Sequence, residues 1–162
     1  MPSGGFCACW ERERHVHDQP SAGRFEGRTH FLPVRIYYED TDMSGIVYHA
    51  NYLRYFERGR SDFLRLAGIH HTQLLERDPP LAFAITGMDI KFKKAARIDD
   101  CLVVQTHYDA IKGVRLVIQQ TIFRGDEVIA TAAVEAVTID LQGRPKRPFK
   151  ELEAQLGPYL LS

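Results

Sequence analysis

The amino-acid sequence predicts an α+β fold in which a curved antiparallel sheet of about five strands wraps around one long central helix. The helix is indicated by apolar residues that recur at steps of four and three over residues 49–67. One segment rich in β-branched and aromatic residues precedes this helix, and four longer segments of the same kind follow it. Short turn signals separate the last four segments and make them antiparallel neighbours. This order of elements implies that the sheet packs on one helix.

The first strand is expected at residues 31–38, and the long helix begins near His49. The apolar stripe of the helix consists of Tyr52, Phe56, Gly59, Phe63 and Leu66. A glycine inside a helix costs about 1 kcal/mol of helix propensity, so close contact with the sheet would explain Gly59. Arg58 and Asp62 stand four residues apart and are expected to pair on the helix surface.

A shorter helix is expected at residues 71–77, before the sequence Asp78-Pro79-Pro80. The later strands are expected at residues 81–94, 101–111, 114–124 and 127–140. Their turn signals are Asp99-Asp100, Lys112-Gly113 and Gly125-Asp126. A last short helix at residues 150–156 closes the chain.

Residues 1–29 lack any helical or strand period, and we interpret them as a flexible extension of a single domain that spans residues 30–162. The extension contains four residues that could be counted as metal ligands, namely Cys7, Cys9, His15 and His17. Their Cys-x-Cys spacing matches no familiar zinc module. We therefore predict no metal site.

The composition excludes several classes of protein. The 162 residues include 21 basic and 21 acidic side chains, a balance that indicates neither a nucleic-acid nor a membrane partner. No apolar run approaches the ~18 residues that span a bilayer, and no secretory h-region is present. Three cysteines, one of them far from the others, do not form a disulfide framework. The expected location is the cytoplasm.

The segment between the first strand and the helix contains the residues best suited to chemistry. Asp42 lies in an acidic cluster, and Gly45 provides a turn before the helix. The unpaired N–H groups of a helix start carry a partial positive charge of ~0.5 units, and Ile46-Val47-Tyr48 offers no capping side chain. A carboxylate here could attack a carbonyl carbon or activate water while the amides hold the oxygen. Alternatively, Asp42 is a loop residue or helix cap.

Residues 37–52 read Tyr-Tyr-Glu-Asp-Thr-Asp-Met-Ser-Gly-Ile-Val-Tyr-His-Ala-Asn-Tyr, and Glu57, Arg58, Arg60 and Phe63-Leu64 follow. This pattern resembles the YbgC-like acyl-CoA thioesterases of the 4-hydroxybenzoyl-CoA thioesterase family, which have the hotdog fold. The likeness covers about residues 31–155. It implies hydrolysis of acyl-CoA thioesters without metal or organic cofactor, with acyl carrier protein as an alternative carrier. It also implies homodimers with a continuous sheet, often paired into tetramers, and sites between subunits.

The resemblance also implies the roles of individual residues. The catalytic aspartate of the family falls on Asp42, and the tyrosine and histidine implicated near it fall on Tyr38 and His49. The backbone N–H of His49 would belong to the oxyanion hole. Basic residues expected on the coenzyme A phosphates match Arg147, Lys112 and Arg115.

Two other functions remain open from the sequence. A hotdog hydratase acting on enoyl thioesters would typically have an Asp-x-Asn-Pro-x-His pattern, whereas Asp42 and His49 are seven residues apart here. A non-catalytic acyl-CoA sensor, or a subunit that organises an envelope-associated complex, would not need Asp42 beside a helix start. Acyl chain length, and the choice between attack by Asp42 and activation of water, are not determined by these residues.

Overall fold

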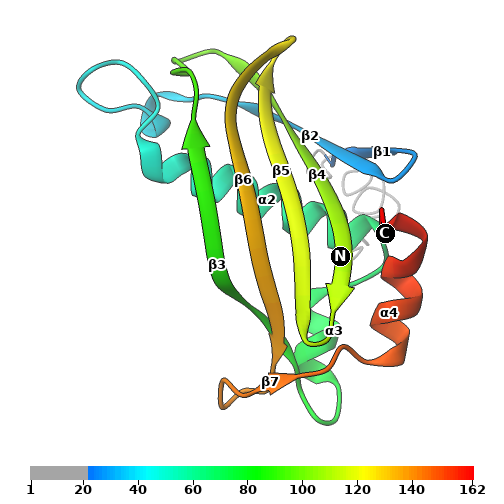
Figure 1. The fold of residues 1–162 in the computed structure, drawn as a ribbon. Coiled ribbons are helices and arrows are strands. Elements are labelled where there is room, and N and C mark those ends of the chain that lie inside the picture. Colours follow the sequence, from blue (N-terminus) through cyan, green and yellow to red (C-terminus); the bar gives the residue numbers. More distant parts are fainter. Residues whose placement is uncertain (1–21) are drawn as a thin grey trace, which may run out of the picture.

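The computed structural model describes residues 22–162, in which one long helix packs across an antiparallel sheet (Figure 1). The strands are β1 (Arg24–Glu26), β2 (Thr29–Arg35), β3 (Ala82–Phe92), β4 (Cys101–Lys112), β5 (Arg115–Arg124), β6 (Glu127–Ile139) and β7 (Pro145–Lys146). The helices are α2 (His49–Leu66), α3 (His71–Glu76) and α4 (Lys150–Leu156), with 3₁₀ helices η1 (Tyr38–Asp40) and η2 (Gly157–Tyr159). The strand order is β1-β2-β4-β5-β6-β3, and β7 pairs with β6. The predicted α+β fold class is confirmed.

The structure differs from the prediction at the N-terminal side of the domain. β1 pairs with β2 through Arg24↔Phe31, so residues 24–29 belong to the sheet rather than to an extension. A strand of three residues is too short to show an alternating pattern, which explains why the sequence did not reveal it. The four candidate metal ligands of the extension lie outside the described residues. β2 ends at Arg35, which places Tyr38 in η1 rather than in a strand.

Close packing of α2 on the sheet explains the glycine in the middle of the helix. A Cβ atom on Gly59 would lie 2.8 Å from Cγ1 of Val104 and 3.0 Å from Oγ1 of Thr106. These two residues belong to β4, so the predicted close contact between helix and sheet is confirmed. Phe56 and Phe63, one turn to either side of Gly59, are completely buried in the core.

One edge of the sheet is free in the described part of the chain. β3 pairs with β6 from Ala82↔Ile139 to Phe92↔Ala130, and no described strand lies on its other side. The side chains of Ile85 and Phe92 on this strand are half exposed. An open edge of this length is a template for pairing with another strand. Among residues 22–162, no helix is both long and apolar enough to cross a membrane.

Candidate active site

Asp42 lies in a tight turn between η1 and α2, which we call the Asp42 turn (residues 41–47). Thr41 and Val47 form an antiparallel bridge at its base. Inside the turn, the Asp42 N–H donates to the carbonyl of Ile46 at 3.0 Å, and the Gly45 N–H donates to the carbonyl of Asp42 at 3.0 Å. Gly45 has a φ of 73°, a conformation that favours glycine. These bonds fix the backbone of Asp42 without using its side chain.

The Asp42 carboxylate is exposed to solvent. Its Oδ1 atom accepts a hydrogen bond of 2.8 Å from the Ser44 N–H and another from the Ser44 hydroxyl. These two hydrogen bonds, with a smaller contribution from the nearby imidazole of His49, hold the pKa of Asp42 below its ordinary value. Asp42 is therefore ionised at neutral pH.

The neighbouring carboxylate, Asp40, has a different role. It is buried, and its Oδ2 atom accepts a hydrogen bond of 2.8 Å from the Tyr37 N–H at the start of η1. Its backbone carbonyl accepts from the Tyr48 N–H at 2.9 Å and from the Asn51 side-chain amide at 2.8 Å. Asp40 thus ties the segment to the first turn of α2, and of these two aspartates only Asp42 is open to solvent.

The start of α2 offers backbone donors beside this carboxylate. The N-cap residue is Tyr48, and its side chain forms no cap hydrogen bond. Among residues 22–162, no side chain accepts a hydrogen bond from the amides of His49 or Ala50. Unpaired first-turn amides attract negative charge, so they could receive an oxygen that becomes negative.

The structure brings His49 near Asp42 but does not bond them. The His49 ring lies 4.5 Å from the Tyr48 ring and 6.5 Å from the Phe92 ring, measured between centroids. Phe92 is the last residue of β3, so the helix start and the free edge strand meet here. The Tyr38 side chain is 83% exposed, and no hydrogen bond joins it to Asp42 or His49 in the described part of the chain. Its backbone carbonyl accepts from the Thr41 hydroxyl at 2.9 Å.

The three basic residues predicted to bind coenzyme A lie at the opposite end of the sheet. Lys112 and Arg115 face each other across the β4–β5 turn, and Arg147 follows β7. The Asp42 turn pairs with residue Arg97, just before β4 begins. The 12 residues of β4 separate the two groups, which corresponds to roughly 35 Å at ~3.3 Å per residue. One subunit alone does not bring the basic residues to Asp42.

Within residues 22–162, Lys112, Arg115 and Arg147 form no ion pair. The other cations near β7 are engaged, because the Asp140 carboxylate lies 3.4 Å from Nζ of Lys146 and 3.7 Å from Nε of Arg144. Arg147 is therefore the exposed arginine in this segment whose charge is not neutralised by a described neighbour.

A groove of about 830 Å³ lies between β2 and α2. It is lined by Val34, Arg35, Arg58, Asp62 and neighbouring residues, and neither Asp42 nor His49 contributes to it. Large apolar side chains are instead exposed in the Asp42 turn, near the start of α2, at the end of β3 and shortly before β4. These are Met43, Tyr48, Leu53, Phe92 and Ile98. A surface of this kind is typical of an interface or a substrate site.

Sequence reasoning missed a buried polar cluster on the same helix. Asp62 pairs with Arg65 and with Nε2 of His30, the latter at 2.9 Å, rather than with Arg58 as predicted. His30 lies 32 residues away in the sequence, so no local spacing could have indicated this pair. Among the described residues, no group of three or more His, Cys, Asp or Glu side chains is arranged to hold a metal ion.

Comparison with known proteins identifies the class to which this fold and site belong. Residues 37–156 match the sequence profile of the Thioesterase-like superfamily, and the chain is a member of that superfamily. It is 40% identical over 124 residues to the acyl-CoA thioesterase YbgC of Haemophilus influenzae, which covers 76% of this chain and 90% of the relative. It is 36% identical over 125 residues to the acyl-CoA thioester hydrolase YbgC of Escherichia coli. This alignment covers 76% of this chain and 92% of the relative.

Within the superfamily, these identities place the chain in the YbgC family. The crystal structure of a probable thioesterase from Bartonella henselae superimposes with a TM-score of 0.73 at 40% identity, over 75% of this chain and 99% of that one. The family resemblance expected from residues 37–52, and the hotdog fold that it implied, are confirmed.

Proposed function

We propose that this protein hydrolyses an acyl-CoA thioester to a free acid and coenzyme A, with Asp42 as the essential carboxylate. The observation that carries this proposal is the position of Asp42, which is ionised, exposed and held in the turn that leads into a helix start with open amides. The names of the YbgC relatives support the same reaction. A thioester carbonyl is already reactive, so a positioned carboxylate and oxyanion donors suffice for its hydrolysis.

In the general-base route, Asp42 takes a proton from water as the water oxygen attacks the thioester carbon. The carbonyl oxygen becomes negative and is held by the backbone N–H groups at His49 and Ala50. Loss of one such donor typically costs about 3 kcal/mol of transition-state stabilisation. Collapse of this tetrahedral intermediate breaks the C–S bond and releases the coenzyme A thiolate, which takes up a proton. In the alternative route, Asp42 itself attacks and water then hydrolyses the mixed anhydride.

The roles of the two aromatic neighbours follow from their positions. His49 is close enough to Asp42 to favour its ionised form and to stabilise the departing thiolate when protonated. Tyr38 is exposed on η1, where its hydroxyl is free to contact the substrate or a second subunit.

We further propose that the working unit is a homo-oligomer in which the β3 edges of two subunits pair. β3 runs from Ala82, beside the β6–β7 end of the sheet, to Phe92, which lies near His49. Antiparallel pairing about a two-fold axis would therefore bring the β7 end of one subunit to the Asp42 end of the other. Arg147 of the second subunit would then approach the coenzyme A phosphates, with Lys112 and Arg115 farther along the sheet. We expect this enzyme to act in the cytoplasm.

The proposal is tested by thiol release from purified protein with short, long and aromatic acyl-CoAs, and with acyl carrier protein thioesters. We expect release with at least one of them. Asp42→Asn should abolish it while the far-UV spectrum and oligomeric state stay unchanged. Glu39→Gln, at a neighbouring exposed carboxylate, is the matched control and should retain turnover.

Three outcomes would contradict the proposal. Turnover by Asp42→Asn would reject the assigned residue. Tight acyl-CoA binding without any thiol release would favour the non-catalytic alternative. Formation of a 3-hydroxyacyl product from crotonyl-CoA would favour the hydratase.

A further inference from the structure

A short loop between β3 and β4 supports the proposed site from outside. We call residues 94–100 the bracket loop. Val47, in the Asp42 turn, donates its N–H to the carbonyl of Ala96 at 2.8 Å. The neighbouring residue, Ile46, forms an antiparallel bridge with Arg97. The Asp42 turn is thus held along one side by the backbone of the bracket loop.

The bracket loop also holds the start of α2. The side chain of Tyr52, which lies one turn after His49, is 4% exposed, and its hydroxyl accepts a hydrogen bond of 3.1 Å from the Ala96 N–H. Ala96 is completely buried. Ala96 therefore contacts the Asp42 turn through its carbonyl, and it contacts the Tyr52 side chain, near the N-terminal end of α2, through its amide. Any displacement of Ala96 would move the carboxylate and the backbone donors relative to each other.

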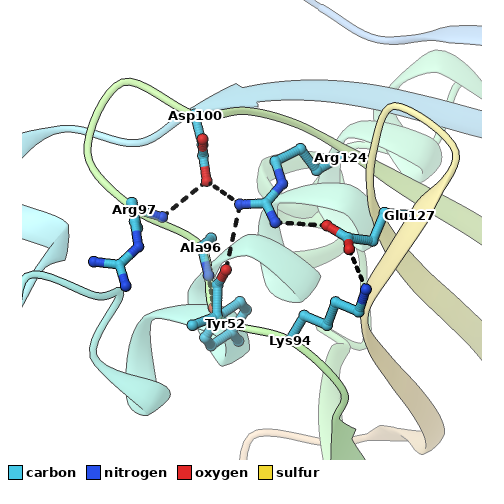
Figure 2. Close-up of polar contacts among 8 residues, drawn as sticks. Tyr52, Lys94, Ala96, Arg97, Asp100, Arg124 and Glu127 are labelled. Atoms are coloured by element: carbon cyan, nitrogen blue, oxygen red, sulfur yellow. Dashed lines mark hydrogen bonds and ion pairs between the residues drawn. The ribbon is translucent and has the colours of Figure 1, made fainter.

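Arg124 fixes the bracket loop in turn, as Figure 2 shows. It is the last residue of β5, a rigid central strand. Its Nη1 atom donates to Oδ2 of Asp100 at 2.7 Å and to the carbonyl of Ala95 at 3.3 Å. Its Nη2 atom donates to Oε2 of Glu127 at 2.5 Å, and Glu127 also pairs with Lys94. The guanidinium thus joins both ends of the loop to the sheet.

Asp100 is held in one orientation by these bonds. Besides Arg124, the Arg97 N–H donates to the same Oδ2 atom at 2.8 Å. Burial opposes ionisation of Asp100 and is the largest single influence, but the hydrogen bonds from Arg97 and Arg124 outweigh it and hold the pKa below its ordinary value. The carboxylate is therefore charged, and its pair with Arg124 is a charge-assisted one.

We propose that Arg124 is a positioning residue of the thioesterase, which acts through Asp100 and the bracket loop to set the distance between Asp42 and the amides of α2. The inference rests on the proposed function. Arg124 does not need to touch the substrate. Its planar fork is what allows three acceptors to be engaged at once, which a lysine ammonium at the end of a flexible chain cannot reproduce.

The consequence for catalysis follows from geometry. Misplacement of a reacting group by about 1 Å can cost about 100-fold in rate, even when the substituted residue lies away from the chemistry. Arg124→Lys preserves the charge but not the fork, so it should lower kcat by about 10- to 100-fold, with KM changed much less. A residue that merely contributed to stability would leave the kcat of the folded enzyme unchanged.

The experiment compares Arg124→Lys with Arg24→Lys, in which the native arginine is exposed, pairs with the neighbouring Glu26 and lies over the Phe31 ring, far from the bracket loop in the sheet order. Both variants are assayed with an acyl-CoA and with the same acyl group on pantetheine, which lacks the phosphates of coenzyme A. We expect the same fold-loss of kcat for both substrates in Arg124→Lys and no loss in Arg24→Lys. Hydrogen exchange at the Val47 and Ala96 amides should be faster only in Arg124→Lys.

A loss that is confined to acyl-CoA, or that resides in KM, would make Arg124 a phosphate ligand and overturn the inference. Asp100→Asn provides a second variant should Arg124→Lys fail to fold. It should lower kcat by no more than Arg124→Lys does, and the double variant should be no slower than Arg124→Lys alone, since the Asp100 contact is one of the three that Arg124→Lys disrupts. If the double variant instead lost the product of the two single-variant losses in kcat, Arg124 and Asp100 would act independently, and the proposed positioning role through Asp100 would be rejected.

Failure of this inference can be distinguished from failure of the proposed function. If wild-type protein releases thiol and Asp42→Asn does not, the function stands. An Arg124→Lys variant as active as Arg24→Lys would then reject the positioning role alone.

Discussion

Helix α2 has an aspartate and a histidine associated with each of its ends, and the two pairs have opposite surroundings. At the N-terminal end, Asp42 and His49 are both exposed. Toward the C-terminal end, Asp62 and His30 are both buried, at 6% and 0% exposure. The residue types are the same, but their burial and their partners differ.

The buried carboxylate accepts hydrogen bonds from three protein groups. Asp62 Oδ2 accepts from Nε2 of His30 at 2.9 Å and from the Gly23 N–H at 2.7 Å, while Oδ1 accepts from Arg65. Asp42, in contrast, accepts only from Ser44 among the described residues. A buried carboxylate that three protein donors already engage is shielded from water and from a substrate carbonyl carbon. We infer that Asp62 ties β1 and β2 to the helix, and that Asp42 is left free for chemistry.

The largest expected contrast is in stability, between Asp→Asn substitutions at the two ends of α2. Asp62→Asn removes the charge paired with Arg65 and weakens the buried hydrogen bonds from His30 and Gly23, so it should lower the free energy of unfolding by about 2–3 kcal/mol. Asp42→Asn should change it by less than about 0.5 kcal/mol, as expected for an exposed side chain. Urea denaturation at one fixed protein concentration measures both values, because the stability of an oligomer depends on concentration.

Activity should respond in the opposite sense. Folded Asp62→Asn should keep a kcat within about two-fold of wild type, whereas Asp42→Asn should lose turnover. The comparison fails if Asp62→Asn is as inactive as Asp42→Asn under conditions where circular dichroism shows it to be folded.

The contrast also explains which features could be predicted from the sequence. The bounds of α2 and α4 and most of the four later strands were predicted to within one or two residues, because their apolar patterns repeat over whole elements. Asp42 could be singled out because the carboxylate, the glycine turn and the helix start are adjacent in the chain.

Features that depend on contacts between distant segments could not be predicted. His30 meets Asp62 across 32 residues, and Arg124 meets Asp100 across 24. Neither pair has a characteristic spacing, and each depends on how a strand packs against its neighbours. The relation of Arg147 to Asp42 requires, in our proposal, a second subunit, and a single sequence contains no pattern for that geometry.

A smaller effect is expected from the pH dependence of stability. Burial lowers the pKa of His30 below its ordinary value of 6.5, although the hydrogen bond and charge of Asp62 act in the opposite direction. Below pH 6.5 the unfolded chain therefore binds more protons at this position than the folded protein does. Stability should fall as the pH is lowered through 6.5 toward the pKa of folded His30.

His30→Gln tests this assignment, because glutamine keeps a donor for Asp62 but does not titrate. Urea midpoints measured from pH 7.5 to 5 should decline less in His30→Gln than in wild type, whereas turnover by the folded variant should be unaffected. Parallel declines in the two proteins would show that other groups govern the pH dependence.

The smallest expected effect is a shift in the pH dependence of activity, caused by a substitution beside Asp42. Ser44→Ala removes the hydroxyl that bonds Asp42 and leaves the backbone N–H, so the pKa of Asp42 should rise toward its ordinary value of 3.8. Because the proposed reaction uses the ionised carboxylate, the acid limb of kcat/KM should move to higher pH. The plateau rate should change by about two-fold or less, as for other exposed substitutions.

Ser44→Thr retains the hydroxyl and serves as the matched control, with an acid limb at the wild-type position. Ser44 is the one described side chain bonded to Asp42, so this substitution leaves the carboxylate to solvent and to one backbone amide. No single substitution could do the same to Asp62, which has three separate partners. An acid limb that does not move in Ser44→Ala would mean that the ionisation controlling the reaction belongs to a group other than Asp42.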